Sequence, residues 1–269
     1  MPCQARDSDV SRPVSVEIAS PAYVLRTRPY GELDVIATLL TERHGKITGI
    51  AKAAKHSRRR FGGTLQPFVH VRAVFTQRPH SDLVFLVRCE LLAALRSFSE
   101  DLDRFAAGSY VIDLTDRMTV GRESGHDVHR LLDEALGLLD RGVPIDPLLR
   151  AFELHLLATT GYEPALDRCR GCGTDIGGAD TAFLVVERGG LACRRCVPPG
   201  ELVRPMAPAT ARVLAALATR PLAEAVDVGP IPGEARAVAE HLLAAVTSGP
   251  VRSRAFLSRP RVDSPPTVR

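Results

Sequence analysis

The chain has 269 residues, of which 45% are hydrophobic and 25% charged, and its formal net charge is +4. This composition is ordinary for a globular protein, and the length suits two or three domains. No apolar run approaches the roughly 18 residues needed to cross a membrane, and the start lacks an apolar signal core, so we expect no membrane partner and a cytoplasmic location.

The N-terminal region predicts a small β-barrel. Residues 1–15 are polar without periodicity, and we expect them to be disordered. Five β-branched or apolar runs then fill residues 16–88, separated by Gly, Pro or charged breaks. These predicted strands are Val16–Leu25, Asp34–Leu40, Lys46–Ala51, Leu65–Thr76 and Leu83–Val87. Five short strands fit an OB-fold barrel, which binds single strands, and they fit an SH3-like barrel as well.

Positive charge is concentrated within this barrel region. Between Arg43 and Ser81 the chain carries nine Lys or Arg residues and no Asp or Glu, while the remainder holds 26 basic and 31 acidic residues. Such a one-sided field attracts a polyanion such as nucleic acid, because neutralised phosphates release their counterions. The alternative is a solvated charge run that serves only solubility. The candidate nucleic-acid-binding residues are Arg43, Lys46, Lys52, Lys55, Arg58, Arg59 and Arg60.

Aromatic and histidine side chains in the same region are less informative. Tyr30, Phe61 and Phe68 are candidates for stacking on bases, but aromatic residues make up only 5% of the chain and most must fill the core. We therefore expect binding to be mainly electrostatic. Four histidines are interpreted as surface polar groups: His44, His56, His70 and His80.

Helical periodicity begins after Arg88. A first helix is predicted behind Ser99, and a second one covers Val128–Leu139. A third follows Pro147, and the last two are predicted over Pro208–Thr219 and Pro232–Ser248. Together they predict a helical domain of residues 89–165 and 204–250, interrupted by an insert at 166–203 and followed by a flexible tail at 251–269.

The insert contains two C-x-x-C pairs. Cys169 and Cys172 form the first pair, and Cys193 and Cys196 form the second after 20 intervening residues. Each pair places two thiolates on one tight knuckle, and two knuckles complete a tetrahedral site for one zinc ion. The segment Phe183–Ala192 predicts a hairpin, as in a zinc ribbon. A redox pair and cysteines that merely pack are the alternatives, and two matched pairs favour zinc over both.

Four thiolates around zinc leave no open position for water, so the ion is expected to be structural. Arginines surround these sulfurs in the sequence, at Arg168, Arg170, Arg188, Arg194 and Arg195. They either offset the negative charge of the zinc–thiolate group or form a second nucleic-acid surface.

The order of these features resembles the RecO family of bacterial recombination-mediator proteins. The likeness spans about residues 16–250 and includes both cysteine pairs. It rests on the segments Ala22–Leu25, Tyr30–Asp34, Leu39–Thr41, Gly45–Lys46, Ala51–Lys52, Gly63–Phe68, Phe152–Leu157 and Gly161–Pro164. At two positions this chain departs from the family pattern, which usually has Gly in place of Ala53 and Arg in place of His56.

The resemblance implies an α+β multidomain fold with an N-terminal five-stranded OB-fold barrel, an α-helical bundle body and a four-cysteine zinc-ribbon insert. It also implies binding of single- and double-stranded DNA and annealing of complementary strands. Such proteins work with RecR, RecA and single-strand-binding protein in the repair of gaps and double-strand breaks, at the nucleoid in the cytoplasm. By position, Lys46, Lys52, Lys55 and Arg58–Arg60 match the basic OB-fold region, and the four cysteines match the zinc ligands.

Our leading hypothesis is a non-enzymatic DNA-binding mediator. An enzyme such as a nuclease or glycosylase would need clustered carboxylates near the groove, and residues 43–81 contain none. The alternative is a zinc-stapled OB-fold protein that binds RNA or associates with ribosomes. A preference for DNA over RNA at equal salt would separate the two.

Overall fold

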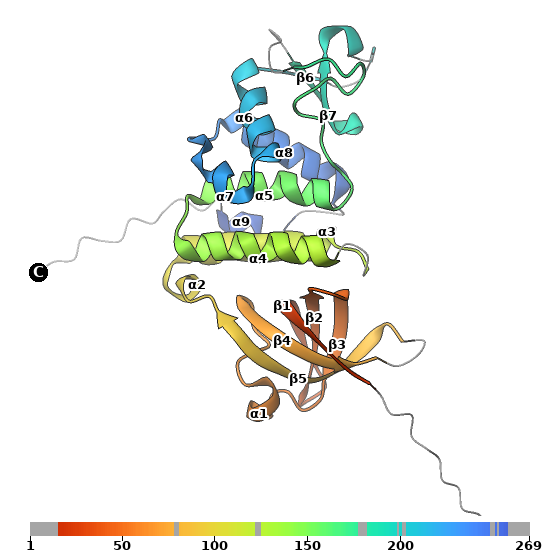
Figure 1. Ribbon diagram of the computed structural model, residues 1–269, viewed down its shortest axis with the longest axis vertical. Helices are drawn as coiled ribbons and strands as arrows, with labels where there is room; N and C mark the ends of the chain where they lie inside the picture. The colour runs from red at the N-terminus through yellow and green to blue at the C-terminus, as the bar shows by residue number, and fades with distance from the viewer. Residues whose placement is uncertain are drawn as a thin grey trace, which may run out of the picture.

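The computed structural model describes residues 16–77, 81–121, 125–176, 182–197, 199–200, 203–247, 251 and 253–257. The expected disorder of residues 1–15 and the expected flexibility of the tail beyond residue 257 lie outside this range. Figure 1 shows three parts in a row: a β-barrel at one end, helices in the middle and a small β-sheet at the other end. No helix within the described ranges combines the length and the apolar character needed to cross a bilayer.

The barrel is a closed five-stranded sheet with strand order β1-β2-β3-β5-β4. Strands β3 and β5 pair in parallel, and the other neighbours pair antiparallel. This arrangement confirms the predicted OB-like barrel. The strands are β1 (Glu17–Tyr30), β2 (Asp34–Thr41), β3 (Gly45–Ala51), β4 (Val69–Thr76) and β5 (Leu83–Ala94).

Three strand boundaries differ from the prediction. β1 continues beyond Leu25, because a bulge between Val24 and Arg26 allows pairing with β2 as far as Tyr30. β5 pairs with β4 as far as Ala94, so the barrel extends past Arg88. The predicted strand start at Leu65 is wrong, since Phe68 adopts a left-handed backbone with φ of 62° just before β4.

Alternating side chains fill the barrel, as a period of two requires. Val24, Leu39, Ile47 and Phe75 point inward from four strands and are buried. The short helix α1 (Arg58–Phe61) lies between β3 and β4 and places Phe61 in the same core. Figure 1 shows α1 at the end of the barrel that faces away from the helices.

The helical body contains eight α-helices in the described residues, and the last four of them follow the cysteine insert in the chain. They are α2 (Ser97–Glu100), α3 (Leu102–Met118), α4 (Gly125–Arg141), α5 (Ile145–Thr159), α6 (Pro208–Thr219), α7 (Leu222–Ala225), α8 (Gly233–Val246) and α9 (Arg254–Leu257), with a 3₁₀ turn at Val226–Val228. The predicted cap Ser99 instead lies within α2. Asp101 caps α3, because its carboxylate accepts hydrogen bonds from the N–H groups of Asp103 and Arg104 at 2.9 and 3.1 Å.

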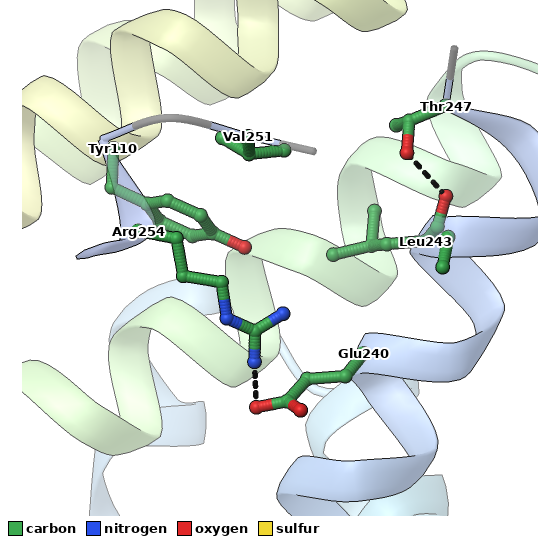
Figure 2. A pocket seen from close by; sticks show the side chains of 7 residues that line it. Tyr110, Glu240, Leu243, Thr247, Val251 and Arg254 are labelled. Carbon is green, nitrogen blue, oxygen red and sulfur yellow. Dashed lines mark hydrogen bonds and ion pairs between the residues drawn. The ribbon is translucent and has the colours of Figure 1, made fainter. Parts of the chain in front are cut away.

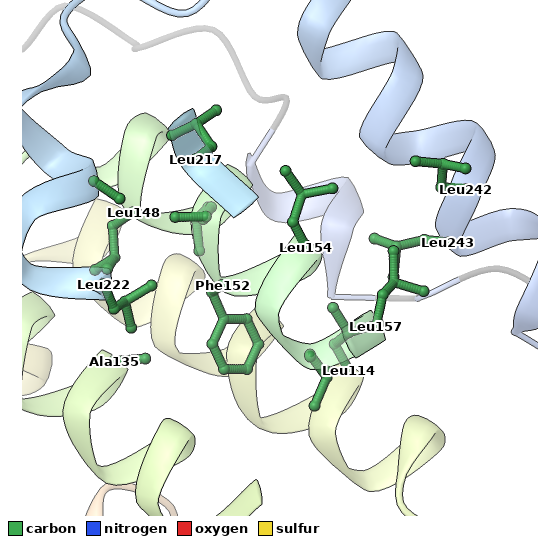
Figure 3. Close-up of a cluster of buried hydrophobic side chains, with 14 of the residues drawn as sticks. Leu114, Ala135, Leu148, Phe152, Leu154, Leu157, Leu217, Leu222, Leu242 and Leu243 are labelled. Atoms are coloured by element: carbon green, nitrogen blue, oxygen red, sulfur yellow. The ribbon is translucent and has the colours of Figure 1, made fainter. Parts of the chain in front are cut away.

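Helix α5 forms the centre of the body. It is apolar around most of its circumference, as expected of a helix surrounded by others. Figure 3 shows Leu148, Phe152, Leu154 and Leu157 of α5 among side chains of the neighbouring helices. These neighbours are Leu114 of α3, Ala135 of α4, Leu217 of α6, Leu222 of α7, and Leu242 and Leu243 of α8.

The cysteine insert folds as a three-stranded sheet in the order β7-β6-β8. β6 (Ala182–Val185) and β7 (Gly190–Cys193) form the predicted hairpin, joined by a 3₁₀ turn at Val186–Arg188, and β8 (Arg204–Met206) pairs with β6. Leu184 and Leu191 belong to the same buried cluster as the helices. The insert therefore shares its core with the body and is not an independent module.

Part of the predicted tail is docked on the body. Val251 is partly buried, Ser253 Oγ donates a hydrogen bond to Asp113 Oδ2 at 2.8 Å, and Arg254 of α9 pairs with Glu240 of α8. Residues 253–257, which belong to the stretch predicted to be a flexible tail, therefore contact helices α3 and α8.

A polar and aromatic cluster joins the barrel to the body. Tyr23 of β1 stacks on His70 of β4 with ring centroids 4.5 Å apart, and His129 of α4 lies 5.6 Å from each ring. The Tyr23 hydroxyl donates to Asp133 of α4 at 2.6 Å. His70, expected at the surface, is therefore half-buried in this junction.

Candidate nucleic-acid interface and metal centre

The four cysteines of the insert converge on one point. The sulfur atoms of Cys169, Cys172, Cys193 and Cys196 all lie within 4.8 Å of one another. Tetrahedral zinc with Zn–S bonds of about 2.3 Å would set its sulfurs roughly 3.8 Å apart, and the Cys172–Cys193 separation is 3.9 Å. Among the described residues, this is the one cluster of His, Cys, Asp or Glu that could hold a metal ion. The donor set fits zinc.

Backbone geometry shapes the first knuckle. Gly173 adopts a left-handed conformation with φ of 72°, and its N–H donates to the Cys169 carbonyl oxygen at 2.8 Å. The N–H groups of Gly171 and Cys193 donate to Cys169 Sγ at 3.4 and 3.3 Å. A side chain at Gly171 would collide with Cys196, so glycine allows the two knuckles to approach closely.

The electrostatics of the cluster favour a cation. A hydrogen bond with the Thr174 hydroxyl is the largest factor that lowers the pKa of Cys172 to about 6. The neighbouring sulfurs, Cys172 first, raise the pKa of Cys196 to about 12. Four crowded thiols therefore cannot all ionise unless a positive ion offsets their mutual repulsion. A divalent ion bound by four thiolates would supply a structural cross-link and no open catalytic position.

The predicted basic segment is divided between the two ends of β3. Arg43 lies in the turn before β3 and Lys46 at its start, next to the helices, where the Lys46 N–H donates to the Gly121 carbonyl oxygen. Lys52, Lys55 and the α1 arginines follow the other end of β3. Six residues of extended chain span about 20 Å, so Lys46 and Lys52 do not form one patch.

The Lys46 side chain is bonded to the helical body. Its ammonium group donates to the backbone carbonyl oxygen of Asp116 at 2.6 Å and lies 3.3 Å from the Asp116 carboxylate. Arg26 lies 3.3 Å from the same carboxylate. The lysine side chain is only 21% exposed. Arg43 is 75% exposed, and its distance of 3.9 Å from Glu42 makes that ion pair weak.

Asp34 organises the turn that follows β3. Its Oδ1 accepts the Ala53 N–H at 2.8 Å, and its Oδ2 lies 2.7 Å from Lys52 Nζ. These bonds, the Lys52 contact foremost, lower the pKa of Asp34. Ala53 has φ of 52°, a conformation that favours glycine. The departure from the family pattern at this position is therefore accommodated with backbone strain.

Unneutralised cations gather beyond this turn. Lys55 Nζ donates to the Glu32 carbonyl oxygen at 2.7 Å, and Arg60 donates to the Lys52 carbonyl oxygen at 2.7 Å and packs over the Phe61 ring. Neither cation is paired with a carboxylate in the described structure, and the same holds for exposed Arg58 and Arg59. These residues form a positive surface at the end of the barrel away from the helices.

Two further residues border this surface: one predicted base-stacking aromatic residue, and one arginine that the sequence analysis did not include. Tyr30 is 52% exposed and pairs across the hairpin with Asp34, whereas Phe61 and Phe68 are buried in the two cores. Arg28 lies two residues before Tyr30 on the same side of β1 and is exposed. Sequence reasoning missed Arg28 because it ended the strand at Leu25. We call Arg28, Tyr30, Lys52, Lys55, Arg58, Arg59 and Arg60 the distal cluster.

The helical body contains a pocket of about 430 Å³, which is a second candidate binding site. Figure 2 shows Arg254 paired with Glu240 and the Thr247 hydroxyl bonded to the Leu243 carbonyl oxygen. The Tyr110 hydroxyl donates to the fully buried Glu153 at 2.5 Å. Tyr110, Glu240 and Arg254 thus join neighbouring helices of the body, and Thr247 bonds back to its own helix, which indicates a structural role for the polar lining residues.

Comparison with known proteins gives matches over both parts of the chain. A family model described as Recombination protein O N terminal matches residues 15–95, and one described as Recombination protein O C terminal matches residues 99–255. The boundary between them falls where β5 ends and α2 begins.

Several curated relatives carry the name DNA repair protein RecO. The protein from Anaeromyxobacter sp. (strain K) is 36% identical over 221 residues, which cover 82% of this chain and 87% of that protein. The protein from Syntrophus aciditrophicus is 34% identical over 194 residues, covering 71% and 75%. The protein from Koribacter versatilis is 40% identical over 174 residues, covering 65% and 70%.

Proposed function

This chain belongs to the RecO family of DNA repair proteins, and we propose that it is a non-enzymatic recombination mediator that binds DNA and anneals complementary strands. The observation that carries this proposal is the distal cluster. Apart from Lys52, which pairs with Asp34, its cations are not paired with a described carboxylate, and they lie at the end of the OB-like barrel that faces away from the helices. Barrels of this kind bind single strands through a positive groove and stacking aromatics.

The cluster is suited to sequence-independent contact with phosphates. Arg58 and Arg59 are exposed on α1, and Lys55 is held against the β1–β2 turn by its bond to Glu32. Arginine can bind a phosphate through two parallel hydrogen bonds, and each neutralised phosphate releases counterions. Tyr30 offers one exposed ring on which a base can stack.

Annealing needs no catalytic group in this account. A positive surface reduces the repulsion between two strands, and holding both on one protein makes their pairing effectively intramolecular. The carboxylate next to the cluster, Asp34, is already bonded to Lys52 and Ala53. We therefore assign it to turn geometry and not to strand cleavage.

Family membership also supports a proposal about finer roles. We propose that the protein binds single- and double-stranded DNA at the nucleoid, and that it acts with RecR to load RecA onto DNA coated by single-strand-binding protein. We also propose that the ion of the four-cysteine cluster is a single structural zinc, held by Cys169, Cys172, Cys193 and Cys196.

The test is an annealing assay with complementary oligonucleotides coated by the cognate single-strand-binding protein. The wild type should accelerate annealing, and the variant Arg58→Gln/Arg59→Gln should lose most of that acceleration. The matched control is Arg130→Gln/Arg141→Gln, which removes two exposed arginines of α4. Failure of the wild type to anneal, or stronger binding to RNA than to DNA of the same sequence, would argue for the RNA-binding alternative.

A further inference from the structure

The two zinc knuckles bring three arginines to one end of the molecule. Arg170 lies between Cys169 and Cys172, while Arg194 and Arg195 lie between Cys193 and Cys196. Since the four sulfurs converge within 4.8 Å, the two knuckles must lie side by side. All three arginines are exposed. We call them the knuckle arginines.

The knuckle arginines are not neutralised by neighbouring carboxylates or cysteine sulfurs in the described structure. Within the described residues, none of them pairs with a carboxylate or bonds to a cysteine sulfur, whereas neighbouring Arg168 lies 3.2 Å from Asp167. Arg194 packs over the Phe183 ring with 5.9 Å between its guanidinium carbon and the ring centroid, which orients the group without neutralising it. The sulfur charge is instead spread over N–H donors such as those of Gly171 and Cys193.

We propose that the knuckle arginines form a second binding site for the phosphodiester backbone of a nucleic acid. Three guanidinium groups exceed the charge of −2 that four thiolates and one divalent ion would carry, so the tip of the insert stays positive. Guanidinium groups recognise phosphates through paired hydrogen bonds. Contacts to the phosphodiester backbone carry no base-sequence information, so the site should bind strands of different sequence alike.

The position of this site gives it a distinct role. Figure 1 shows the insert and α1 at opposite ends of the molecule, with the helical body between them. One protein can therefore hold one strand at the distal cluster and a second strand at the knuckles. This bridging role rests on the proposed function of the barrel, whereas phosphate binding at the knuckles does not.

The experiment measures bridging and binding separately. To measure bridging, a biotinylated oligonucleotide is immobilised, and the full-length protein is used to capture a non-complementary fluorescent oligonucleotide on it. To measure binding, the fluorescence anisotropy of the fluorescent strand alone is followed as protein is added. The variant is Arg170→Gln/Arg194→Gln/Arg195→Gln. The control, Arg130→Gln/Arg141→Gln/Arg220→Gln, removes the same charge from exposed positions outside the insert. Metal content is measured for each protein.

We expect the knuckle variant to keep its metal, to reduce bridging at least fivefold, and to bind the single strand within about threefold of wild type. The control should bridge normally. Bridging by the knuckle variant at the wild-type level would overturn the proposal. If the glutamine variant loses metal, a variant with lysine at all three positions takes its place. Normal bridging by this lysine variant would also overturn the proposal, because lysine cannot form the paired hydrogen bonds of a guanidinium group. Loss of binding by Arg58→Gln/Arg59→Gln reports on the barrel alone, so the two proposals fail by different results.

Discussion

The ammonium group of Lys46 donates a hydrogen bond to the backbone carbonyl oxygen of Asp116 at 2.6 Å, across the boundary between the barrel and helix α3. The Asp116 carboxylate also lies 3.3 Å from Arg26. Two cations of the barrel are therefore anchored to the body. Together with the Tyr23–Asp133 bond, they fix how the barrel is held against the helices.

This pairing predicts that Lys46 contributes to stability more than to DNA binding. Lys46→Ala should lower the free energy of unfolding by about 1–2 kcal/mol, because it leaves a largely buried carboxylate and carbonyl with fewer partners. Urea denaturation measures this change. The control is Arg43→Ala, an exposed change that should cost less than about 0.5 kcal/mol. A fully stable Lys46→Ala protein with a reduced salt dependence of DNA binding would show that Lys46 contacts phosphate instead.

The left-handed backbone of Ala53 predicts a stabilising substitution. Ala53→Gly removes the close approach of Cβ to the following carbonyl oxygen. Glycine also has greater freedom in the unfolded chain, which offsets part of this gain. The net effect should be a rise of about 0.5–1 kcal/mol in the free energy of unfolding. Thermal unfolding of Ala54→Gly is the control. Its φ is not positive, so the same change should destabilise the protein. The strain argument is wrong if both variants destabilise equally.

The junction histidines predict a pH dependence of stability. Burial, followed by the nearby His70, lowers the pKa of His129 to about 4, while Asp133, Glu42 and His126 also face it. Between about pH 6.5 and 4 the unfolded chain binds a proton that the folded chain does not, so stability falls as pH falls through this window. Between pH 7.5 and 5 we expect His129 to account for a loss of about 1–2 kcal/mol.

Urea denaturation at the two pH values checks this contribution. His129→Leu should lose less stability on acidification than the wild type. The exposed His56→Leu should behave as the wild type. Equal acid sensitivity of all three proteins would exclude His129 as the source.

The metal centre predicts selective loss of structure. Cys169→Ser, or removal of the ion by a chelator, should unfold the insert and raise hydrogen exchange in β6, β7 and α5, since Leu184 and Leu191 share the core of the body. Exchange in the barrel should change little. Metal analysis should find one zinc per wild-type chain, and Cys89→Ser should retain it, because Cys89 is buried in the barrel. Purified wild type without zinc would contradict the assignment.

Local patterns predicted most of the architecture. Strand alternation, helical periodicity and the spacing of the cysteines each specify short-range geometry, and the closed barrel, the body and the hairpin of the insert follow from them. The boundary errors have tertiary causes. The bulge after Val24 and the pairing of β5 with β4 extend two strands beyond what propensity indicates, and Asp101 caps α3 in place of Ser99.

The candidate interface was less predictable, since charge in sequence does not reveal ion pairs in space. Residues 43–81 contain no acidic residue, yet Asp116 of α3 and Asp34 of β2 reach Lys46 and Lys52 from outside that segment. Arg28 was missed because it lies before the segment and joins it only through the β1–β2 hairpin. The convergence of Arg170 with Arg194 and Arg195 likewise depends on the fold of the two knuckles.

The salt dependence of single-strand binding tests the central claim, that the distal cluster contacts phosphates. For single strands, the slope of log affinity against log salt is about −0.7 per neutralised phosphate. The slope for Arg58→Ala/Arg59→Ala should therefore be shallower than that of the wild type by about 1.4, while Arg130→Ala/Arg141→Ala leaves it unchanged. A slope equal to that of the wild type in the α1 variant would contradict the account.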